Sequence, residues 1–224
     1  MKHFDIHPVN RSLETAIQAK IDNLNKPKGA LGRLEEIAMQ VSLIQESLTP
    51  SLAHPCHLLF GGDHGIEREG VSVSPREVTW QQMINFTHGG GGVNMFCRQH
   101  GFKLRIVDVG VDYNLSDVEG IIDRKIARGT KNFRYEAAMS EQEFDQAIHV
   151  GCEMADDCIA EGCQILCVGE MGIANTSPSS IWMSLFGNIP KEMHPDAGRR
   201  GIADAHLSDT NHTTAFSHTV VHQV

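Results

Sequence analysis

The sequence is poor in aromatic residues and in positive charge. Only 6% of its 224 residues are Phe, Trp or Tyr, and 19 Lys and Arg residues stand against 28 Asp and Glu, for a formal net charge of -9 at pH 7. An acidic surface without basic patches repels nucleic-acid phosphates and anionic lipid headgroups. We therefore expect no nucleic acid and no membrane among its partners.

Long hydrophobic runs are also missing. No apolar stretch approaches the roughly 20 residues that a membrane-spanning helix needs. The polar residues Met1 to Asp5 lead directly into a helical pattern, without the hydrophobic stretch of a signal peptide. We expect a cytoplasmic protein.

The cysteines show no metal-binding or disulfide pattern. Most of the six lie in apolar surroundings, and no two have C-x-x-C spacing: Cys56, Cys97, Cys152, Cys158, Cys163 and Cys167. Buried, reduced thiols fit this distribution better than a zinc site or a disulfide framework does. We predict no metal and no cofactor.

Short apolar runs alternate with longer helical segments. Strands are predicted at 56–60, 104–112 and 164–169, and the Ser140–Ala160 segment is predicted as a helix with Ser140 and Glu143 as its capping box. This alternation is typical of an α/β fold with a parallel sheet and helices on both faces.

Two amphipathic helices precede the first strand. Residues 12–25, with Ser12 as the expected cap, and 30–48 have apolar residues at helical spacing. Because they come before the sheet, we assign 1–50 to a small helical subdomain, 51–190 to the α/β domain and 191–224 to an irregular C-terminal tail. The histidines of that tail are interpreted as incidental surface residues.

The stretch Gln164–Pro178 joins a strand to a glycine-rich turn and a predicted helix start. Ser177 suits the N-cap and Pro178 the first helical position, so free backbone N–H groups would face an anion. Glu170 would stand beside it at the carboxyl end of the strand, where ligands bind in open α/β sheets. The alternative is an ordinary βα turn whose glycines only permit tight packing.

Acidic, glycine-containing turns follow the other strands too. Gly61–Gly65 contains Asp63 and His64, and Gly110 is followed by Asp112. We expect these turns and the polar segment 128–132 to meet at one edge of the sheet, with Asp63 orienting His64 or holding its turn together. Ser74 is expected to cap the next helix, and Gly89–Gly92 is interpreted as a close-packing junction rather than a phosphate cradle.

An ordered set of motifs resembles the nicotinate-nucleotide–dimethylbenzimidazole phosphoribosyltransferase family. Any one of them is weak, but together they cover roughly residues 12–190 in family order. They are Lys26-Pro27-Lys28-Gly29-Ala30-Leu31-Gly32-Arg33-Leu34-Glu35, Gly62-Asp63-His64-Gly65, Gly70-Val71-Ser72 with Pro75, Glu77-Val78-Thr79, Gln82-Met83, Gly89-Gly90-Gly91-Gly92, Val107-Asp108-Val109-Gly110-Val111, Gly129-Thr130, Ala138-Met139 and Gly169-Glu170-Met171-Gly172-Ile173-x-Asn175-Thr176, where x is an unmatched position.

The resemblance implies transfer of the phosphoribosyl group of nicotinate mononucleotide to 5,6-dimethylbenzimidazole, giving α-ribazole 5′-phosphate and nicotinate for the lower ligand of cobalamin. It also implies a Rossmann-like domain, a small helical domain and a homodimer. Asp63 and His64 would support the site. By the same resemblance, Ser74, Gln82 and Met83 would line the benzimidazole pocket, and Glu170, Met171, Gly172, Asn175 and Thr176 would hold ribose and phosphate.

The chain departs from the family pattern toward its C-terminus. The Leu-Gly-Glu-Gly stretch that carries the family's general base is absent, and Gly198–Leu207 only partly matches the expected glycine-rich motif. We hypothesise a C-terminally truncated or frame-shifted member with impaired activity, an open strand edge, and Glu170 as the candidate replacement base. The alternatives are a non-catalytic remnant that binds a nucleotide phosphate and, ranked below it, a metal-dependent hydrolase using Asp63, His64 and Glu170.

Overall fold

The computed structural model describes residues 4–187. The chain divides into two compact units between Ala53 and His54, and each is described by itself. The tail predicted for 191–224, with its histidines, lies outside the described residues.

The first unit consists of helices α1 (Glu14–Asp22) and α2 (Arg33–Ile44). Ile17, Ile21 and Leu43 form its small apolar cluster. The prediction that Ser12 caps α1 is wrong: Leu13 occupies the N-cap, and the N–H of Ser12 donates to Asn10 Oδ1 at 3.0 Å. The second helix was predicted too long, since α2 ends at Ile44.

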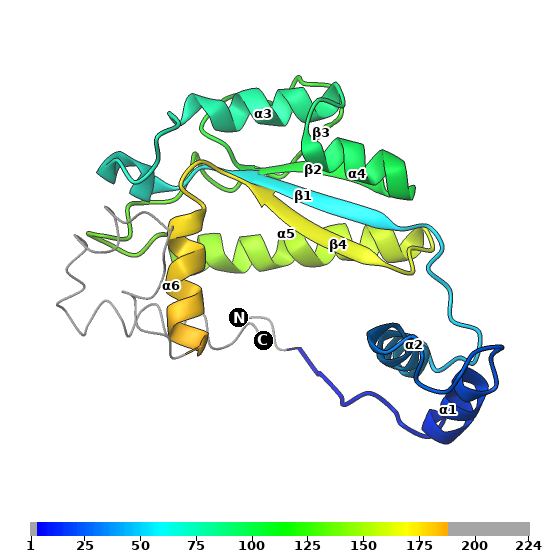
Figure 1. The fold of residues 1–224 in the computed structure, drawn as a ribbon. Helices are drawn as coiled ribbons and strands as arrows, with labels where there is room; N and C mark the ends of the chain where they lie inside the picture. The colour runs from blue at the N-terminus through cyan, green and yellow to red at the C-terminus, as the bar shows by residue number, and fades with distance from the viewer. Residues whose placement is uncertain (1–3, 188–224) are drawn as a thin grey trace. The chain divides into compact units, whose positions relative to one another are not determined.

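The second unit is built on a four-stranded, entirely parallel sheet in the order β3-β2-β1-β4 (Figure 1). The α/β fold class is therefore confirmed. The three-residue strand β3 was not predicted. The strands are β1 (Cys56–Gly62), β2 (Lys103–Gly110), β3 (Ile121–Asp123) and β4 (Leu166–Met171).

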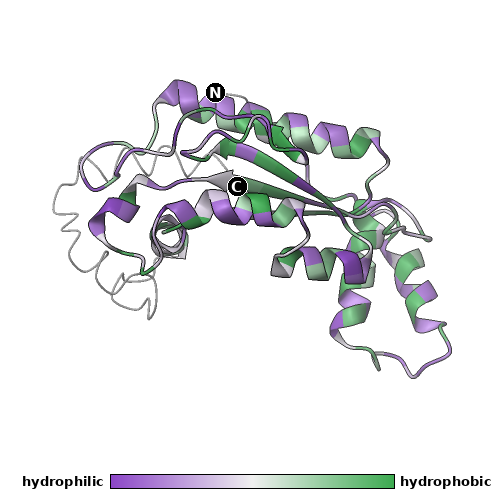
Figure 2. Cartoon of the chain, turned by 90° about the horizontal axis from the view of Figure 1, so that it is seen from above, coloured by the Kyte–Doolittle hydropathy of each residue, from purple (hydrophilic) through white to green (hydrophobic). Residues whose placement is uncertain are grey.

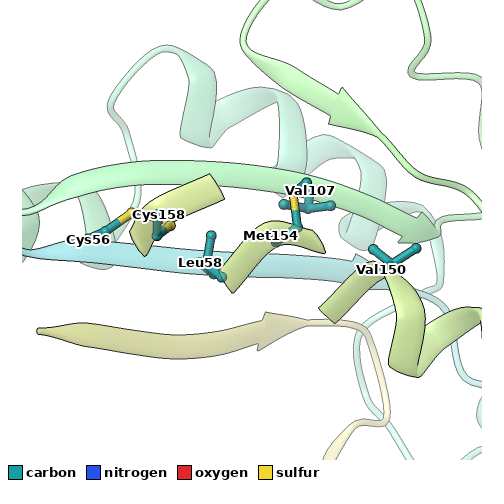
Figure 3. Close-up of a cluster of buried hydrophobic side chains, with 6 residues drawn as sticks. All are labelled: Cys56, Leu58, Val107, Val150, Met154 and Cys158. Atoms are coloured by element: carbon teal, nitrogen blue, oxygen red, sulfur yellow. Dashed lines mark hydrogen bonds between the residues drawn. The ribbon is translucent and has the colours of Figure 1, made fainter. Parts of the chain in front are cut away.

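Helices cover both faces of the sheet, with α3 and α4 above it and α5 below it in Figure 1. Neighbouring residues of β1 point to opposite faces, as they must in a strand. Leu58 packs with Met154 of α5 (Figure 3), and Leu59 packs with Met83 of α3. The helical elements are η1 (Gly65–Glu69), α3 (Glu77–Thr87), α4 (Gly92–His100), α5 (Glu141–Ala160) and α6 (Thr176–Gly187).

The hydropathy of the chain follows this layering. In Figure 2 the strands are coloured mostly as hydrophobic, whereas the helices alternate between hydrophobic and hydrophilic residues. That difference is expected where strands are covered on two faces and helices on one. None of the helices among residues 4–187 has the length and apolarity to cross a membrane.

Of the helix starts predicted in this unit, the one at α5 is confirmed and those at α3 and α6 are wrong. The capping box of α5 is confirmed, because Ser140 Oγ accepts from Glu143 N–H at 3.2 Å and the Glu143 carboxylate accepts from Ser140 N–H at 2.6 Å. Ser74 does not cap α3, which begins at Glu77 after Arg76. Ser177 does not cap α6 either, because that helix already begins at Thr176.

The four-glycine junction between α3 and α4 is a packing device, as predicted. A Cβ on Gly91 would overlap the ring of Phe86. Asn94 closes the junction, accepting from Gly91 N–H at 3.0 Å and donating to Phe86 O at 2.8 Å.

Strand β4 pairs with β1 on one side and is an outer strand of the sheet within the described residues. Its side chains Leu166 and Val168 are 38% and 71% exposed. Within residues 4–187 no further strand pairs with the second edge of β4, and the open edge expected of a truncated family member stays a prediction.

Candidate functional site

The carboxyl ends of β1 and β2 meet through Asp63, whose side chain is only 3% exposed. Its Oδ2 accepts from the Asp112 N–H at 2.8 Å, and its carbonyl accepts from the Thr130 N–H at 2.9 Å. The Thr130 hydroxyl in turn accepts from Gly65 N–H at 3.1 Å. The expected meeting of these turns is confirmed, and Asp63 joins its own turn to the turn after β2 and to the segment 128–132.

Arg76 joins the start of α3 to the same turns. Its Nη1 donates to Asp112 Oδ2 at 2.9 Å, and its Nε lies 3.8 Å from Asp63 Oδ1. The Arg76 side chain is 20% exposed, so it neutralises two carboxylates in a partly dry environment. Sequence reasoning missed Arg76, because nothing in its local sequence indicates a partner 36 residues away.

The turn after β4 is pressed against the end of β1. A Cβ on Gly172 would overlap the carbonyl oxygen of Gly62 and would lie 2.8 Å from ring atoms of His64. His64 Nε2 lies 3.9 Å from Glu170 Oε2. The two acidic turns therefore converge at Gly172, which only a residue without a side chain can occupy.

The loop that follows has a strained and well-braced conformation. Ala174 has φ +71°, in the left-handed region that non-glycine residues seldom adopt. The amide of Asn175 donates to Glu170 Oε1, and its backbone N–H donates to Gly172 O at 3.1 Å. Ser177 N–H donates to Ala174 O at 3.1 Å. The N–H groups of Ala174 and Thr176 have no hydrogen-bond partner among the described residues.

These open N–H groups lie at the beginning of a 12-residue helix, α6. A helix N-terminus carries unpaired donors and a partial positive charge, which together favour an anion. The Ser177 hydroxyl is also buried there without a hydrogen-bond partner among residues 4–187. The half-exposed Glu170 stands beside this N-terminus. The arrangement suits an anion such as a phosphate with a hydroxylated group next to it.

The residues predicted on the benzimidazole side lie on or just before α3. Ser74 and Gln82 are partly buried, and Gln82 Oε1 accepts from Asn85 Nδ2 at 3.2 Å. Met83 is fully buried, and a Cβ on Gly61 would overlap its thioether. Met83 is thus a core residue of the described structure, and its contact with a ligand stays a prediction, as does that of Ser74 and Gln82.

Among residues 4–187, one hydrogen bond links the loop 170–176 to α3. The Ile173 N–H donates to Thr79 Oγ1 at 3.0 Å, and Thr79 is fully buried. Met171 packs into the same apolar cluster as Met83. Thr79 belongs to the motif quoted above, but its local pattern offered no reason to assign it this contact.

The potential metal-binding side chains of residues 4–187 do not gather in one place. Among residues 4–187, no three His, Cys, Asp or Glu side chains gather as potential ligands. All six cysteines are free, and burial, followed by the neighbouring Cys158 thiol, raises the pKa of Cys56 to about 12. Burial also lowers the pKa of His57 in β1, which favours its neutral form.

Comparisons with known proteins agree with the fold. A family model described as phosphoribosyltransferase matches residues 6–213. The nicotinate-nucleotide–dimethylbenzimidazole phosphoribosyltransferase of Bacteroides fragilis is 54% identical over 198 residues, 88% of this chain and 57% of that protein. The protein of the same name from Phocaeicola vulgatus is 52% identical over the same shares of the two chains.

Among solved structures, CobT from Thermus thermophilus matches with a TM-score of 0.80 and 33% sequence identity. The match covers 86% of this chain and 60% of that one. The chain therefore spans somewhat more than half the length of the relatives that it matches.

Proposed function

The chain belongs to the phosphoribosyltransferase family whose curated members are named nicotinate-nucleotide–dimethylbenzimidazole phosphoribosyltransferase, and on that premise we propose that it binds nicotinate mononucleotide and transfers its phosphoribosyl group to dimethylbenzimidazole. The products are α-ribazole 5′-phosphate, nicotinate and a proton. The observation that carries the proposal is the loop 170–176, with open N–H groups at the start of α6 and Glu170 beside them.

In this proposal the nucleotide phosphate binds at the α6 N-terminus. The N–H groups of Ala174 and Thr176 donate to its oxygens, and the helix dipole favours its negative charge. Glu170 accepts from a ribose hydroxyl, in the orientation that its hydrogen bond with Asn175 gives it. Asp63 and His64 act indirectly by holding Gly172 and the loop in place.

The benzimidazole binds on the α3 side, near Ser74 and Gln82. One of its ring nitrogens attacks C1′ while the other loses a proton, and the positively charged nicotinate ring leaves. Because the leaving group is already activated, holding the two reactants in line supplies much of the rate. Glu170 is our candidate for the proton acceptor, since Oε2 is not used by Asn175.

The test is to incubate purified protein with nicotinate mononucleotide and dimethylbenzimidazole and to follow nicotinate by chromatography. We expect benzimidazole-dependent release that falls at least about tenfold in Glu170→Gln, a modest loss for removal of a general base. Glu161→Gln is the matched control, because that carboxylate pairs with Lys103 and Arg105 instead of facing the loop. Nucleotide binding without release would favour the non-catalytic remnant.

Two further properties of the family are proposed for this chain. We propose that it acts in the cytoplasm as a homodimer in cobalamin lower-ligand synthesis. Light scattering coupled to size-exclusion chromatography would give a mass of twice 24.7 kDa for the dimer.

A further inference from the structure

The side chain of Thr79 connects two parts of the proposed site that are 94 residues apart in sequence. Thr79 lies in the first turn of α3, is fully buried, and accepts the Ile173 N–H at 3.0 Å. Among the described residues, no other hydrogen bond joins α3 to the loop 170–176. The bond therefore fixes the loop relative to the helix that carries Gln82.

Glu170 and Met171 also pair with β1, Glu170 approaches His64, and hydrogen bonds within the segment brace it. The contacts of Met171 and Ala174 with the helices and loops around them are apolar. Met171 packs into the cluster under α3, whereas Ala174 packs into a separate cluster with Ile66 and Phe133. Ile173 lies between these two anchors. Apolar contacts are non-directional, so a directional hydrogen bond at Ile173 sets the orientation of the peptide units that follow.

We propose that Thr79 is a positioning residue that couples the nucleotide-binding loop to the azole-binding helix. This inference rests on the proposed function, because the coupling is between nicotinate mononucleotide at the loop and dimethylbenzimidazole on α3. A ligand that shifts α3 also shifts Thr79 and, through its hydroxyl, Ile173 and the adjacent strained Ala174. Each substrate thereby raises the affinity of the site for the other, and linkage makes the two factors equal.

The variants are Thr79→Val, which keeps the shape but removes the acceptor, and Thr79→Ser, which keeps the hydroxyl. The first measurement is hydrogen exchange of the Ile173 amide in the ligand-free protein. We expect exchange to be roughly tenfold faster in Thr79→Val, because a part-buried N–H loses its acceptor, and close to the wild-type rate in Thr79→Ser.

The second measurement is calorimetric titration of nicotinate mononucleotide with and without 5,6-dimethylindole, which keeps the ring N–H and the methyl groups but lacks the nitrogen that attacks C1′, so that no transfer occurs. In the wild type we expect this unreactive analogue to raise the nucleotide affinity about fivefold or more, the usual lower range for coupled sites. This increase in nucleotide affinity should disappear in Thr79→Val, where the ratio of the two affinities should be about one, and it should persist in Thr79→Ser. A merely structural role would lower the stability of Thr79→Val without changing this ratio.

The outcomes separate the two proposals. Absence of nucleotide binding by the wild type would refute the proposed function and the coupling with it. Nucleotide binding with the same coupling factor in the wild type and Thr79→Val would refute the coupling alone. Unchanged exchange of the Ile173 amide in Thr79→Val would also overturn it, because the hydrogen bond would then contribute nothing to the loop.

Discussion

Replacement of Gly172 by alanine tests whether β1 and β4 close on one another as tightly as the structure indicates. The new methyl group would overlap Gly62 O and lie 2.8 Å from ring atoms of His64. The His64 ring can turn away, but Gly62 O belongs to the backbone of β1 and cannot. Gly172 is not among the glycines with positive φ, so the cost is steric and not conformational.

The expected cost follows from how such overlaps are relieved. Forcing an extra methyl group into a packed site costs about 1–3 kcal/mol, since neighbouring backbone must shift. At about 2 kcal/mol, the midpoint of thermal unfolding should fall by about 4–8 °C for a chain of this size. The nucleotide affinity should fall as well, because the shift displaces the loop that begins at Gly172.

Urea unfolding followed by tryptophan fluorescence is the direct assay, because Trp80 and Trp182 both lie in the unit that begins at His54. The matched control is Gly151→Ala within α5, where a Cβ meets nothing within 4 Å. That variant should be stabilised by about 0.5–1 kcal/mol through helix propensity. A Gly172→Ala protein as stable as the wild type would refute the close approach of the two strand ends.

Three further predictions concern α5 and the thiols. Ser140→Ala should lower the free energy of unfolding by about 1 kcal/mol through loss of the N-cap. Hydrogen bonds from Ser140, first from its backbone N–H, lower the pKa of the Glu143 carboxyl group. The ionised carboxylate therefore stabilises the folded protein fully above the ordinary pKa of glutamate, and this stabilisation is lost as the pH falls through the lowered pKa of Glu143. The stability difference between the wild type and Glu143→Gln should thus shrink below about pH 4, and a constant difference would contradict the capping role. Since the pKa of Cys56 is raised to about 12, a thiol reagent at about pH 8 should label Cys152, Cys163 and Cys167 first, and labelling of Cys56 at their rate would show that it is not buried.

Features that depend on nearby residues were predictable from the sequence. The capping box of α5 needs only Ser140 and Glu143, three positions apart, and it forms as expected. Strand β1 was found from its apolar run, although it extends to Gly62 rather than ending at Phe60. The short strand β3 was not predicted, because three residues are too few to show an alternation of apolar and polar side chains.

Features that depend on distant residues were not predictable. Ser74 and Ser177 have the right chemistry for N-caps, but α3 begins only at Glu77, and α6 starts one residue before Ser177. In α6, the turn from Gly172 to Asn175 sets the beginning of the helix. Such tertiary restraints override local capping preference.

The same distinction applies to the site. Asp63 and Glu170 were found because the carboxyl ends of parallel strands share one edge, a rule that needs no side-chain contacts. Arg76 and Thr79 were given no role, since their partners Asp112 and Ile173 lie 36 and 94 residues away. Sequence motifs thus indicated the acidic residues at the strand ends better than the more distant residues that contact them.

The two carboxylate oxygens of Glu170 have different surroundings, and this difference bears on the proposed reaction. Oε1 is committed to the Asn175 amide, so the carboxylate cannot rotate freely, and Oε2 is directed toward the surroundings of His64 at 3.9 Å. Because each carboxylate oxygen has two lone pairs, the available oxygen of this half-exposed group can accept from a ribose hydroxyl, from the azole N–H or from both. Glu170→Gln separates the two roles. Loss of nucleotide affinity would assign Oε2 to the ribose, whereas unchanged affinity with loss of nicotinate release would assign it to the proton.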